Sequence, residues 1–467
     1  MSEGTNFAKG DGAAIPIDCV DGQSFAGYLE QAPAHVAAYA RAVRFEAKPG
    51  ALLLAPSATG GLDRAIFGVE PPDAPARDPF LAGKLANLLP AGDYAFARGP
   101  QDPASAALAF LLSSYKFARY AAGRADRPHL RAPKGVDARE LERIAGAVAF
   151  GRDLVNTPAN DMGPVALTDA ALGLAEKHAA TSRVVAGEAL LDENFPLIHA
   201  VGRAAAQTPR LVEFRHGPED GLKVTLVGKG VCYDTGGLDI KPSSAMALMK
   251  KDMGGAAVAL ALARMLMDAG LPLRLRVILP IVENSVSAAA FRTGDVYKSR
   301  KGLNVEIGNT DAEGRLILAD ALALAGEEET DLLFDFATLT GAARVALGPE
   351  LPPFYTDGDA LAEEIARHGQ SANDPVWRLP LWSPYDAGLD SKIAEVSSTT
   401  SHGFAGSITA ALFLRRFVAD PARWAHFDVY CWNPSTKPGR PEGGEIQAAR
   451  LLYAMIAERA AKRGAAR

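Results

Sequence analysis

The stretch KVTLVGKGVCYDTGGLDIKP, residues 223–242, decides the fold. It opens with an apolar, β-prone run, KVTLVG (223–228), and continues into a glycine-rich loop. This loop carries Lys229, Asp234, Asp239 and Lys241. In open α/β sheets the ligand site lies outside the carboxyl ends of the strands, and glycines let the backbone approach a ligand closely. The sequence therefore predicts a functional site directly after this strand.

Similar apolar runs recur along the C-terminal two thirds of the chain and alternate with helical patterns. The further β-prone runs are LRVILPIV (275–282), LLFDFATL (332–339) and HFDVYCW (426–432). The helical patterns cover residues 254–270, 314–328, 406–418 and 445–462. Near-continuous apolar strands separated by helices indicate a largely parallel sheet that is buried on both faces.

The N-terminal part has an alternation of its own. Strands are predicted at ALLLAP (51–56) and AIFGVE (65–70), a helix at 104–122, a Pro- and Arg-rich linker at 123–135 and a long helix at 137–158. We therefore predict an α/β fold with three parts. They are a smaller N-terminal α/β domain over 1–135, a linking helix over 136–160, and a larger C-terminal α/β domain over 161–467 with a mostly parallel central sheet.

Composition narrows the class of protein. The 467 residues carry a formal net charge of −6, so no overall attraction to nucleic acid or acidic membranes is expected. Cys19, Cys232 and Cys431 are too few and too scattered for a disulfide framework, and no CxxC pair exists for a thiolate zinc site. The start, MSEGTNFAKGDG, lacks the apolar region of a secretory signal. We expect a soluble, cytoplasmic protein.

Acidic residues gather in three segments of the C-terminal domain. Asp234 lies in the loop after the first strand, Asp252 precedes a helix in MKKDMGGAA (249–257), and Asp311 and Glu313 lie in IGNTDAEGRLILAD (307–320). Each alone is readily explained as a helix cap or a solvated turn. Four carboxylates at strand ends, however, are the ligand type that divalent cations take, and carboxylates can bridge two ions. The residues alone indicate a possible di-metal hydrolase. A phosphate-binding role for the glycine-rich loop is disfavoured, because neither the GxxxxGK[ST] nor the GxGxxG spacing occurs.

Several ordered motifs resemble the leucyl aminopeptidases, the cytosol (M17-type) aminopeptidase family. NTDAEGRL (309–316) matches the hallmark octapeptide of that family at every position. The loop 227–242 and the segment KKDMGGAA (250–257) resemble two further family motifs. Residues 152–164, 377–381, 406–414 and 424–428 resemble further family segments, and SSYKFARY (113–120) extends the likeness weakly into the N-terminal domain. The resemblance covers about residues 150–467 and implies a di-metal site on the central sheet.

The resemblance assigns roles residue by residue. One tightly held metal would be bound by Lys229, Asp234, Asp252 and Glu313, and a more exchangeable one by Asp234, Asp311 and Glu313. Lys241 would be catalytic, and Arg315 would hold a bicarbonate ion that relays a proton. Substrate contacts would fall on Met249, Asn309, Thr338, Leu339 and Gly341. A lysine ligates only as a neutral amine, which an adjacent dication makes possible by lowering the lysine pKa.

These roles imply a hydrolase that removes the N-terminal residue of peptides with a free amino terminus, using a water activated by two metals. The metals would be zinc or manganese, with magnesium or cobalt also acceptable at the exchangeable position. A homohexamer is implied as well. One departure affects specificity: Tyr430 and Cys431 stand where the family usually has Ala-Gly. The alternatives are a narrow dipeptidase, for example for Cys-Gly, with the same site, and an inactive binding or assembly relative.

Overall fold

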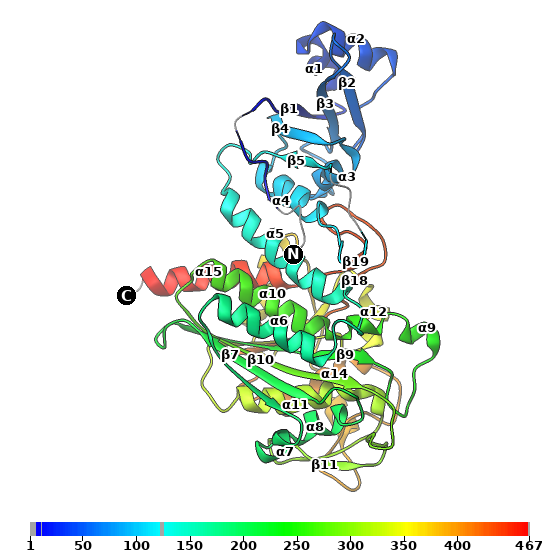
Figure 1. Ribbon diagram of the computed structural model, residues 1–467, viewed down its shortest axis with the longest axis vertical. Helices are drawn as coiled ribbons and strands as arrows, with labels where there is room; N and C mark the ends of the chain where they lie inside the picture. The colour runs from blue at the N-terminus through cyan, green and yellow to red at the C-terminus, as the bar shows by residue number, and fades with distance from the viewer. Residues whose placement is uncertain (1–5, 11, 122–125, 466–467) are drawn as a thin grey trace. The chain divides into compact units, whose positions relative to one another are not determined.

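The computed structural model describes residues 6–10, 12–121 and 126–465, and the chain divides into two compact units (Figure 1). The first comprises Met1–Phe150 and Ser435–Glu442, and the second comprises Gly151–Pro434 and Gly443–Arg467. The long helix predicted at 137–158 is observed as α5 (Ala138–Asn156) and contains the change from one unit to the other. The short return of residues 435–442 to the first unit has no signal in the sequence pattern.

The first unit is built on a five-stranded sheet in the order β2-β3-β1-β4-β5. Its strands are β1 (Ile15–Asp21), β2 (Leu52–Pro56), β3 (Leu62–Val69), β4 (Gly92–Arg98) and β5 (Pro128–Leu130). Its helices besides α5 are α1 (Phe25–Gln31), α2 (Ala34–Ala42), η1 (Leu81–Lys84), α3 (Leu85–Leu88) and α4 (Pro103–Ser113). Only the β2–β3 pair is antiparallel among the pairs of this sheet in the described residues. This α/β unit confirms the predicted smaller N-terminal fold.

The predicted helix 104–122 is shorter than its apolar pattern indicates. Asp102 caps its start, since its side chain accepts a hydrogen bond from the amide of Ser105 at 3.0 Å. At the other end the Ser114 hydroxyl donates to the carbonyl of Phe110 at 2.8 Å, which satisfies one of the last carbonyls as the helix stops. Residue 122 and residues 123–125 of the predicted linker lie outside the described residues.

The second unit is built on a nine-stranded mixed sheet in the order β15-β14-β17-β13-β8-β10-β7-β6, with β9 paired to β10. The strands are β6 (Thr181–Ala186), β7 (Arg210–His216), β8 (Leu222–Gly228), β9 (Gly230–Asp234), β10 (Leu273–Asn284), β13 (Leu332–Ala337), β14 (Pro353–Tyr355), β15 (Trp377–Arg378) and β17 (Trp424–Asp428). The central strands β17, β13, β8 and β10 are parallel, and antiparallel pairs flank them on both sides. The predicted mostly parallel central sheet is confirmed.

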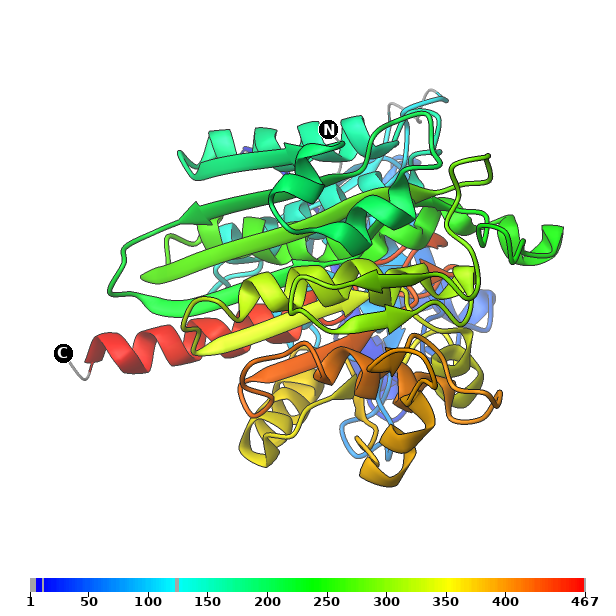
Figure 2. The same ribbon diagram turned by 90° about the horizontal axis from the view of Figure 1, so that it is seen from below.

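Helices cover both faces of this sheet, as Figures 1 and 2 show. One face carries α6 (Pro164–Lys177), α10 (Gly254–Asp268) and α15 (Ala449–Ala465). The other carries α8 (Pro196–Gly202), α11 (Glu313–Ala325) and α14 (Gly406–Arg415). Strands that are covered on both sides bury nearly all of their side chains, which explains why their sequences are apolar without alternation.

Shorter elements complete the second unit. They are α7 (Ala189–Asp192), α9 (Ser243–Met246), η2 (Met249–Met253), β11 (Val296–Lys298), β12 (Asn304–Glu306), η3 (Thr310–Ala312), α12 (Gly341–Leu347), α13 (Asp359–Ser371), η4 (Ser383–Leu389), β16 (Val396–Ser397), β18 (Trp432–Asn433) and β19 (Gly443–Gly444). Within the described part of the chain, no helix has both the length and the apolar character needed to cross a bilayer.

Two predicted strands end earlier than their apolar runs. The run 332–339 leaves the sheet after Ala337, and the run 426–432 leaves it after Asp428. The carboxylate of Asp428 explains the first ending, because it accepts hydrogen bonds from the amides of Leu339 and Thr340 at 3.0 and 3.2 Å. Those amides therefore do not take part in the hydrogen bonds of the sheet, and the segments that follow both strands can line a site.

Candidate active site

Side chains from four segments of the second unit meet at the carboxyl ends of its parallel strands. Lys229 directly follows β8, and Asp234 ends β9. Asp252 lies on the 3-10 turn η2, and Glu313 begins α11. One carboxylate oxygen from each of Asp234, Asp252 and Glu313 lies within 4.8 Å of the others, and all three residues are buried. The site is therefore where the loop after β8 predicts it.

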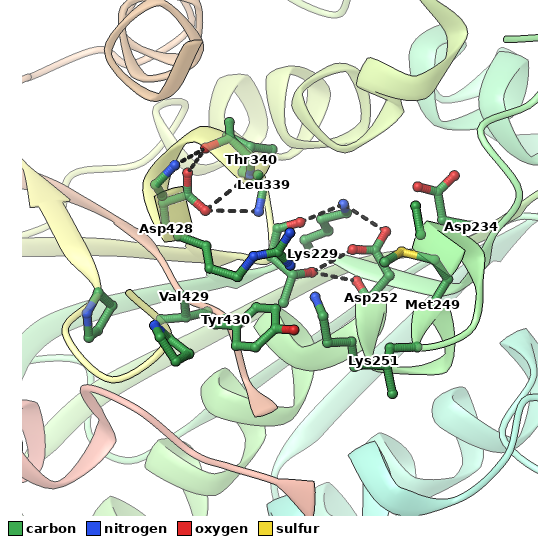
Figure 3. Close-up of a pocket in the computed structure, with 18 of the residues that line it drawn as sticks. Lys229, Asp234, Met249, Lys251, Asp252, Leu339, Thr340, Asp428, Val429 and Tyr430 are labelled. Atoms are coloured by element: carbon green, nitrogen blue, oxygen red, sulfur yellow. Dashed lines mark hydrogen bonds and ion pairs between the residues drawn. The ribbon is translucent and has the colours of Figure 1, made fainter. Parts of the chain in front are cut away.

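Lys229 contacts two of these three carboxylates, and Figure 3 shows its contact with Asp252. Its Nζ lies 2.8 Å from Asp252 Oδ2 and 3.0 Å from Glu313 Oε1, and it donates to the Thr338 carbonyl at 3.1 Å. A Cβ at position 314 would lie 2.7 Å from Cε and 2.8 Å from Nζ of this lysine, so any residue other than glycine would displace the end of the Lys229 side chain. The glycine of the octapeptide thus lets Lys229 reach the first turn of α11.

Lys241 approaches the cluster from the opposite end of the same loop. Its Nζ lies 2.8 Å from Asp234 Oδ2 and also pairs with Asp311, the fourth carboxylate. Asp239 serves a different purpose from its neighbours. Its carboxylate accepts a hydrogen bond from the amide of Thr310 at 2.7 Å and from the hydroxyl of Thr293 at 2.8 Å. Asp239 therefore fastens the lysine-bearing loop to the turn that carries Asp311.

Asn284 and Thr310 are positioning residues that the sequence patterns did not indicate. Asn284, at the end of β10, donates from Nδ2 to Asp234 Oδ1 at 2.8 Å and to the Thr310 carbonyl at 3.1 Å. The Thr310 hydroxyl donates to the Gly236 carbonyl at 2.7 Å. The available sequence signal was the position of Asn284 at the carboxyl end of a central strand. A buried amide is rarely left without hydrogen-bond partners, so an Asn at this position indicates contacts with polar groups of the site.

Electrostatics within the cluster are unbalanced. Burial, followed by the charge of Asp234, raises the pKa of Glu313 to about 8. The same two causes raise the pKa of Asp311 to about 6. Burial alone would lower the pKa of Lys229, but the charges of Asp252 and the other carboxylates raise it well above its usual range. The cluster therefore carries more negative charge than its two lysines neutralise, and the excess charge is shared among the buried carboxylate oxygens.

The cluster opens into a cavity of about 450 Å³, large enough for a short peptide. Four of the five predicted substrate contacts line it: Met249, Thr338, Leu339 and Gly341. Asn309 does not; its side chain caps the turn η3 by accepting a hydrogen bond from the amide of Asp311 at 2.7 Å. Asn309 therefore orients a cluster carboxylate and stands beside the cavity, not on its lining.

Arg315 is also outside the lining of the cavity. It is buried, its Nη1 donates to the Ser398 carbonyl at 2.6 Å, and its Nε has no hydrogen-bond partner among the described residues. Burial lowers its pKa to about 10. A buried guanidinium with a free donor has capacity for one further acceptor, which is what an anion such as bicarbonate would supply.

The far wall of the cavity holds residues to which the motifs assigned no role. Lys251 Nζ lies 4.7 Å from the centre of the Tyr430 ring, and the Arg344 guanidinium carbon lies 4.9 Å from it. Asp428, on the same wall, holds the turn after β13 through the amides of Leu339 and Thr340. Tyr430 was visible in the sequence as a departure from the family motif, and Lys251 stands directly beside a predicted metal ligand.

Comparisons with known proteins identify the relatives of this chain. Residues 149–453 match the model of the cytosol aminopeptidase family, catalytic domain, and residues 15–133 match that of the M17 aminopeptidase N-terminal domain. A "Probable cytosol aminopeptidase" of Syntrophotalea carbinolica is 40% identical over 74% of this chain and 73% of its own length. The protein of the same description from Chlamydia trachomatis is 43% identical over 62% of this chain; the match spans 59% of that relative.

Solved structures show the same relationship. The crystal structure of cytosol aminopeptidase from Coxiella burnetii superposes with a TM-score of 0.92 at 40% identity, over 97% of this chain and 99% of that one. The bottromycin maturation enzyme BotP, in complex with Mn, superposes with a TM-score of 0.84 at 33% identity, over 96% of this chain and all of that one (100%). Two family models that together span most of the chain, and a carboxylate–lysine cluster where the motifs predict it, lead to one conclusion: the chain belongs to the M17 cytosol aminopeptidase family.

Proposed function

We propose that this protein is a di-metal aminopeptidase that hydrolyses the first peptide bond of peptides with a free amino terminus. The observation that carries the proposal is the charge of the cluster. Four carboxylates, those of Asp234, Asp252, Asp311 and Glu313, face only two lysine ammoniums in their ion pairs. Buried negative charge in excess is stabilised by cations, and carboxylate oxygens are their usual hard ligands.

The donor set fits two divalent ions. Lys229, Asp234, Asp252 and Glu313 would hold one, and Asp234, Asp311 and Glu313 the other, so that Asp234 and Glu313 bridge. When bound, such ions supply Lewis acidity and a water of lowered pKa. Zinc or manganese is proposed for the tight position, with magnesium or cobalt also acceptable at the exchangeable one. The manganese complex of BotP, a structural relative, supports manganese as a candidate.

Each lysine has its own task in this proposal. Lys229 would lose its proton to become a ligand, since an adjacent dication reverses the effect that the carboxylates have on its pKa. Lys241 would stay protonated, and its ammonium at the cavity wall would stabilise the negative charge that develops on the scissile carbonyl oxygen. The two groups lie in one loop but are proposed to act in opposite protonation states.

Arg315 would hold bicarbonate as the general base that relays the proton from the attacking water. Its buried Nε, which no described residue accepts from, supports this role. Thr338, Leu339, Gly341 and Met249 would form the walls against which the substrate backbone and first side chain lie. Asn309 is proposed to act by holding the Asp311 backbone.

The test is hydrolysis of aminoacyl anilides by purified protein after chelation and after reconstitution with single metals, paired with metal analysis. We expect activity to be lost on chelation, to return with manganese or zinc, and to saturate at two ions per chain. An N-acetylated substrate is the matched control and should be refused. Two bound ions with no turnover of any free-amine peptide would support the inactive relative instead.

Location and assembly are proposed on family grounds. We propose a cytoplasmic homohexamer that needs no membrane and no nucleic acid. Light scattering at micromolar concentration tests the assembly, and a monomeric mass would contradict it.

A further inference from the structure

The cavity has a cationic end as well as an anionic one. Lys251 and Arg344 both line it, and both lie within cation–π distance of Tyr430, at 4.7 and 4.9 Å from the ring centre. Figure 3 shows Lys251 extending toward Tyr430 at the side of the cavity away from Asp234. Two cations that share one aromatic ring repel each other, so this arrangement calls for a compensating anion.

Lys251 has no ion pair of its own among the described residues, although the negative charge of the adjacent Asp252 favours its protonated form. Its side chain is buried, with 5% of the residue exposed, yet none of these residues accepts a hydrogen bond from it or forms an ion pair with it. Asp252, the adjacent acid, is engaged elsewhere: it lies 2.8 Å from Lys229 and accepts from the Thr338 hydroxyl at 2.7 Å. A buried ammonium without a carboxylate or carbonyl partner is costly, and such groups mark binding sites.

Arg344, on α12, is exposed and likewise makes no ion pair with a described residue. Asp428 is an acid that lines the same cavity. Its Oδ1 accepts from the amides of Leu339 and Thr340, and its Oδ2 accepts from the hydroxyls of Thr340 and Ser407 at 2.6 and 3.2 Å. Its acceptors are therefore in use, and Arg344 remains available to a ligand.

We propose that Lys251 and Arg344, held by Tyr430, form a subsite for a substrate carboxylate. The proposal rests on the aminopeptidase function above and names its substrate class: peptides that carry a carboxylate close to the amino terminus. The α-amine of such a peptide goes to the carboxylate end of the cavity and its anionic group to the cationic end. A cavity of about 450 Å³ with opposite charges at its two ends favours a short dipolar ligand.

Two kinds of peptide present this carboxylate, and separate substrate pairs distinguish them. In the first, the N-terminal residue is acidic, so kcat/KM is compared for Glu-Ala-amide and Gln-Ala-amide. In the second, the peptide is a dipeptide whose own C-terminus is the anion, so Leu-Gly is compared with Leu-Gly-amide. In at least one of the two pairs, we expect kcat/KM to be roughly 10- to 100-fold higher for the anionic peptide than for its neutral partner. This is the effect expected of a hydrogen bond to a charged group.

Variants then connect the preference to the two cations. Lys251→Met and Arg344→Met should each reduce the anionic-to-neutral ratio by about 10-fold or more, and Arg344→Glu should reverse it in favour of the neutral member of the pair. Arg344 is exposed, so its variants are expected to fold even if those of buried Lys251 do not. Lys392→Met is the matched control, because Lys392 is an exposed lysine outside the cavity lining.

The outcomes separate the two proposals. Turnover of the neutral peptides with no preference for either anionic partner would overturn the carboxylate subsite while leaving the aminopeptidase intact. A preference that survives in Arg344→Met and Arg344→Glu would also overturn it. No metal-dependent turnover of any of the four peptides would refute the underlying function first.

Discussion

Two clusters of charged side chains in the second unit invite comparison, because each contains four acids. The cavity cluster pairs its acids with two lysines, Lys229 and Lys241. The other, which we call the arginine cluster, pairs four acids with four arginines, and its arginines lie on β6, β7 and β10. Its members are Arg183, Arg215, Arg274, Arg276, Glu193, Glu213, Glu219 and Glu328.

The pKa values of the central acids move in opposite directions. Burial by itself would raise the pKa of Glu213, but the charge of Arg276 and hydrogen bonds from Arg183 and other arginines lower it to about 2. Burial and a neighbouring carboxylate raise the pKa of Glu313 to about 8. Charge balance is the difference: the arginine cluster has as many arginines as acids, whereas the cavity cluster has more carboxylates than cations in its ion pairs and so has capacity for a cationic ligand.

The largest effect is expected at the centre of the unbalanced cluster. Glu313→Gln removes a charge proposed to bridge two ions, so we expect activity to fall beyond the roughly 10²–10³-fold typical of losing one oxyanion donor. Metal content, measured by elemental analysis after gel filtration, should fall with it. Asp311→Ala should behave in the same direction. Full metal occupancy in Glu313→Gln would contradict the bridging role.

The next effect separates the two lysines within this cluster. Lys241→Ala should lower kcat by roughly 10²–10³-fold while both ions stay bound, because its role is to stabilise the oxyanion. Lys229→Ala should instead weaken the tight metal position, since its amine is a proposed ligand. Metal counts on the two variants decide the matter. Equal metal loss in both variants would contradict the assignment of Lys229 as a metal ligand and of Lys241 as the group that stabilises the oxyanion.

The cavity cluster could be predicted from the sequence far better than its surroundings. The octapeptide 309–316 and the loop 227–242 carry all of its acids but Asp252, together with both lysines, and place them after strands. The cationic wall could not be predicted, because Lys251, Arg344 and Tyr430 are distant in sequence and meet only through the turns after β13 and β17. The end of the strand at 332–339 was misplaced for the same reason, because the hydrogen bond that the Leu339 amide donates to Asp428 is nonlocal.

The arginine cluster could not be predicted from the sequence either. Its arginines lie on strands that also carry apolar residues, and β6 and β7 were not predicted at all. Arg276 is buried in β10 at 6% exposure, where the run LRVILPIV reads as plain core. Nothing in a single sequence pairs it with Glu213, 63 residues away. Local sequence patterns therefore predict strands and short-range motifs. Charged residues that pair across the sheet can be predicted only when the order of the strands is known.

A smaller effect is expected at Asp428, which touches neither the proposed metals nor the arginine cluster. Asp428→Ala leaves the amides of Leu339 and Thr340 without their acceptor, so the wall of the cavity loosens. We expect kcat/KM to fall by about 10–100-fold with metal content unchanged, as for outer-shell partners of metal sites. Asp428→Asn is the matched control, because its remaining oxygen can still accept both amides. Equal losses in the two variants would show that the charge of Asp428, or the hydroxyls that donate to its Oδ2, matters more than the two amide hydrogen bonds.

The smallest effect on activity is expected where the charges are balanced. Glu213→Gln should leave metal content and kcat nearly unchanged but lower the free energy of unfolding at neutral pH by an amount on the order of 3 kcal/mol, since the pKa of Glu213 falls from its ordinary 4.5 to about 2 on folding. A lowered folded-state pKa contributes stability that is fully present above about 4.5 and is lost as the pH falls toward 2. Urea unfolding of both proteins at pH 7 and near pH 3 checks this. The stability gap between wild type and variant should narrow at the lower pH; a gap that stays constant would show that Glu213 acts through packing, and the contrast between the two clusters would then not be one of charge.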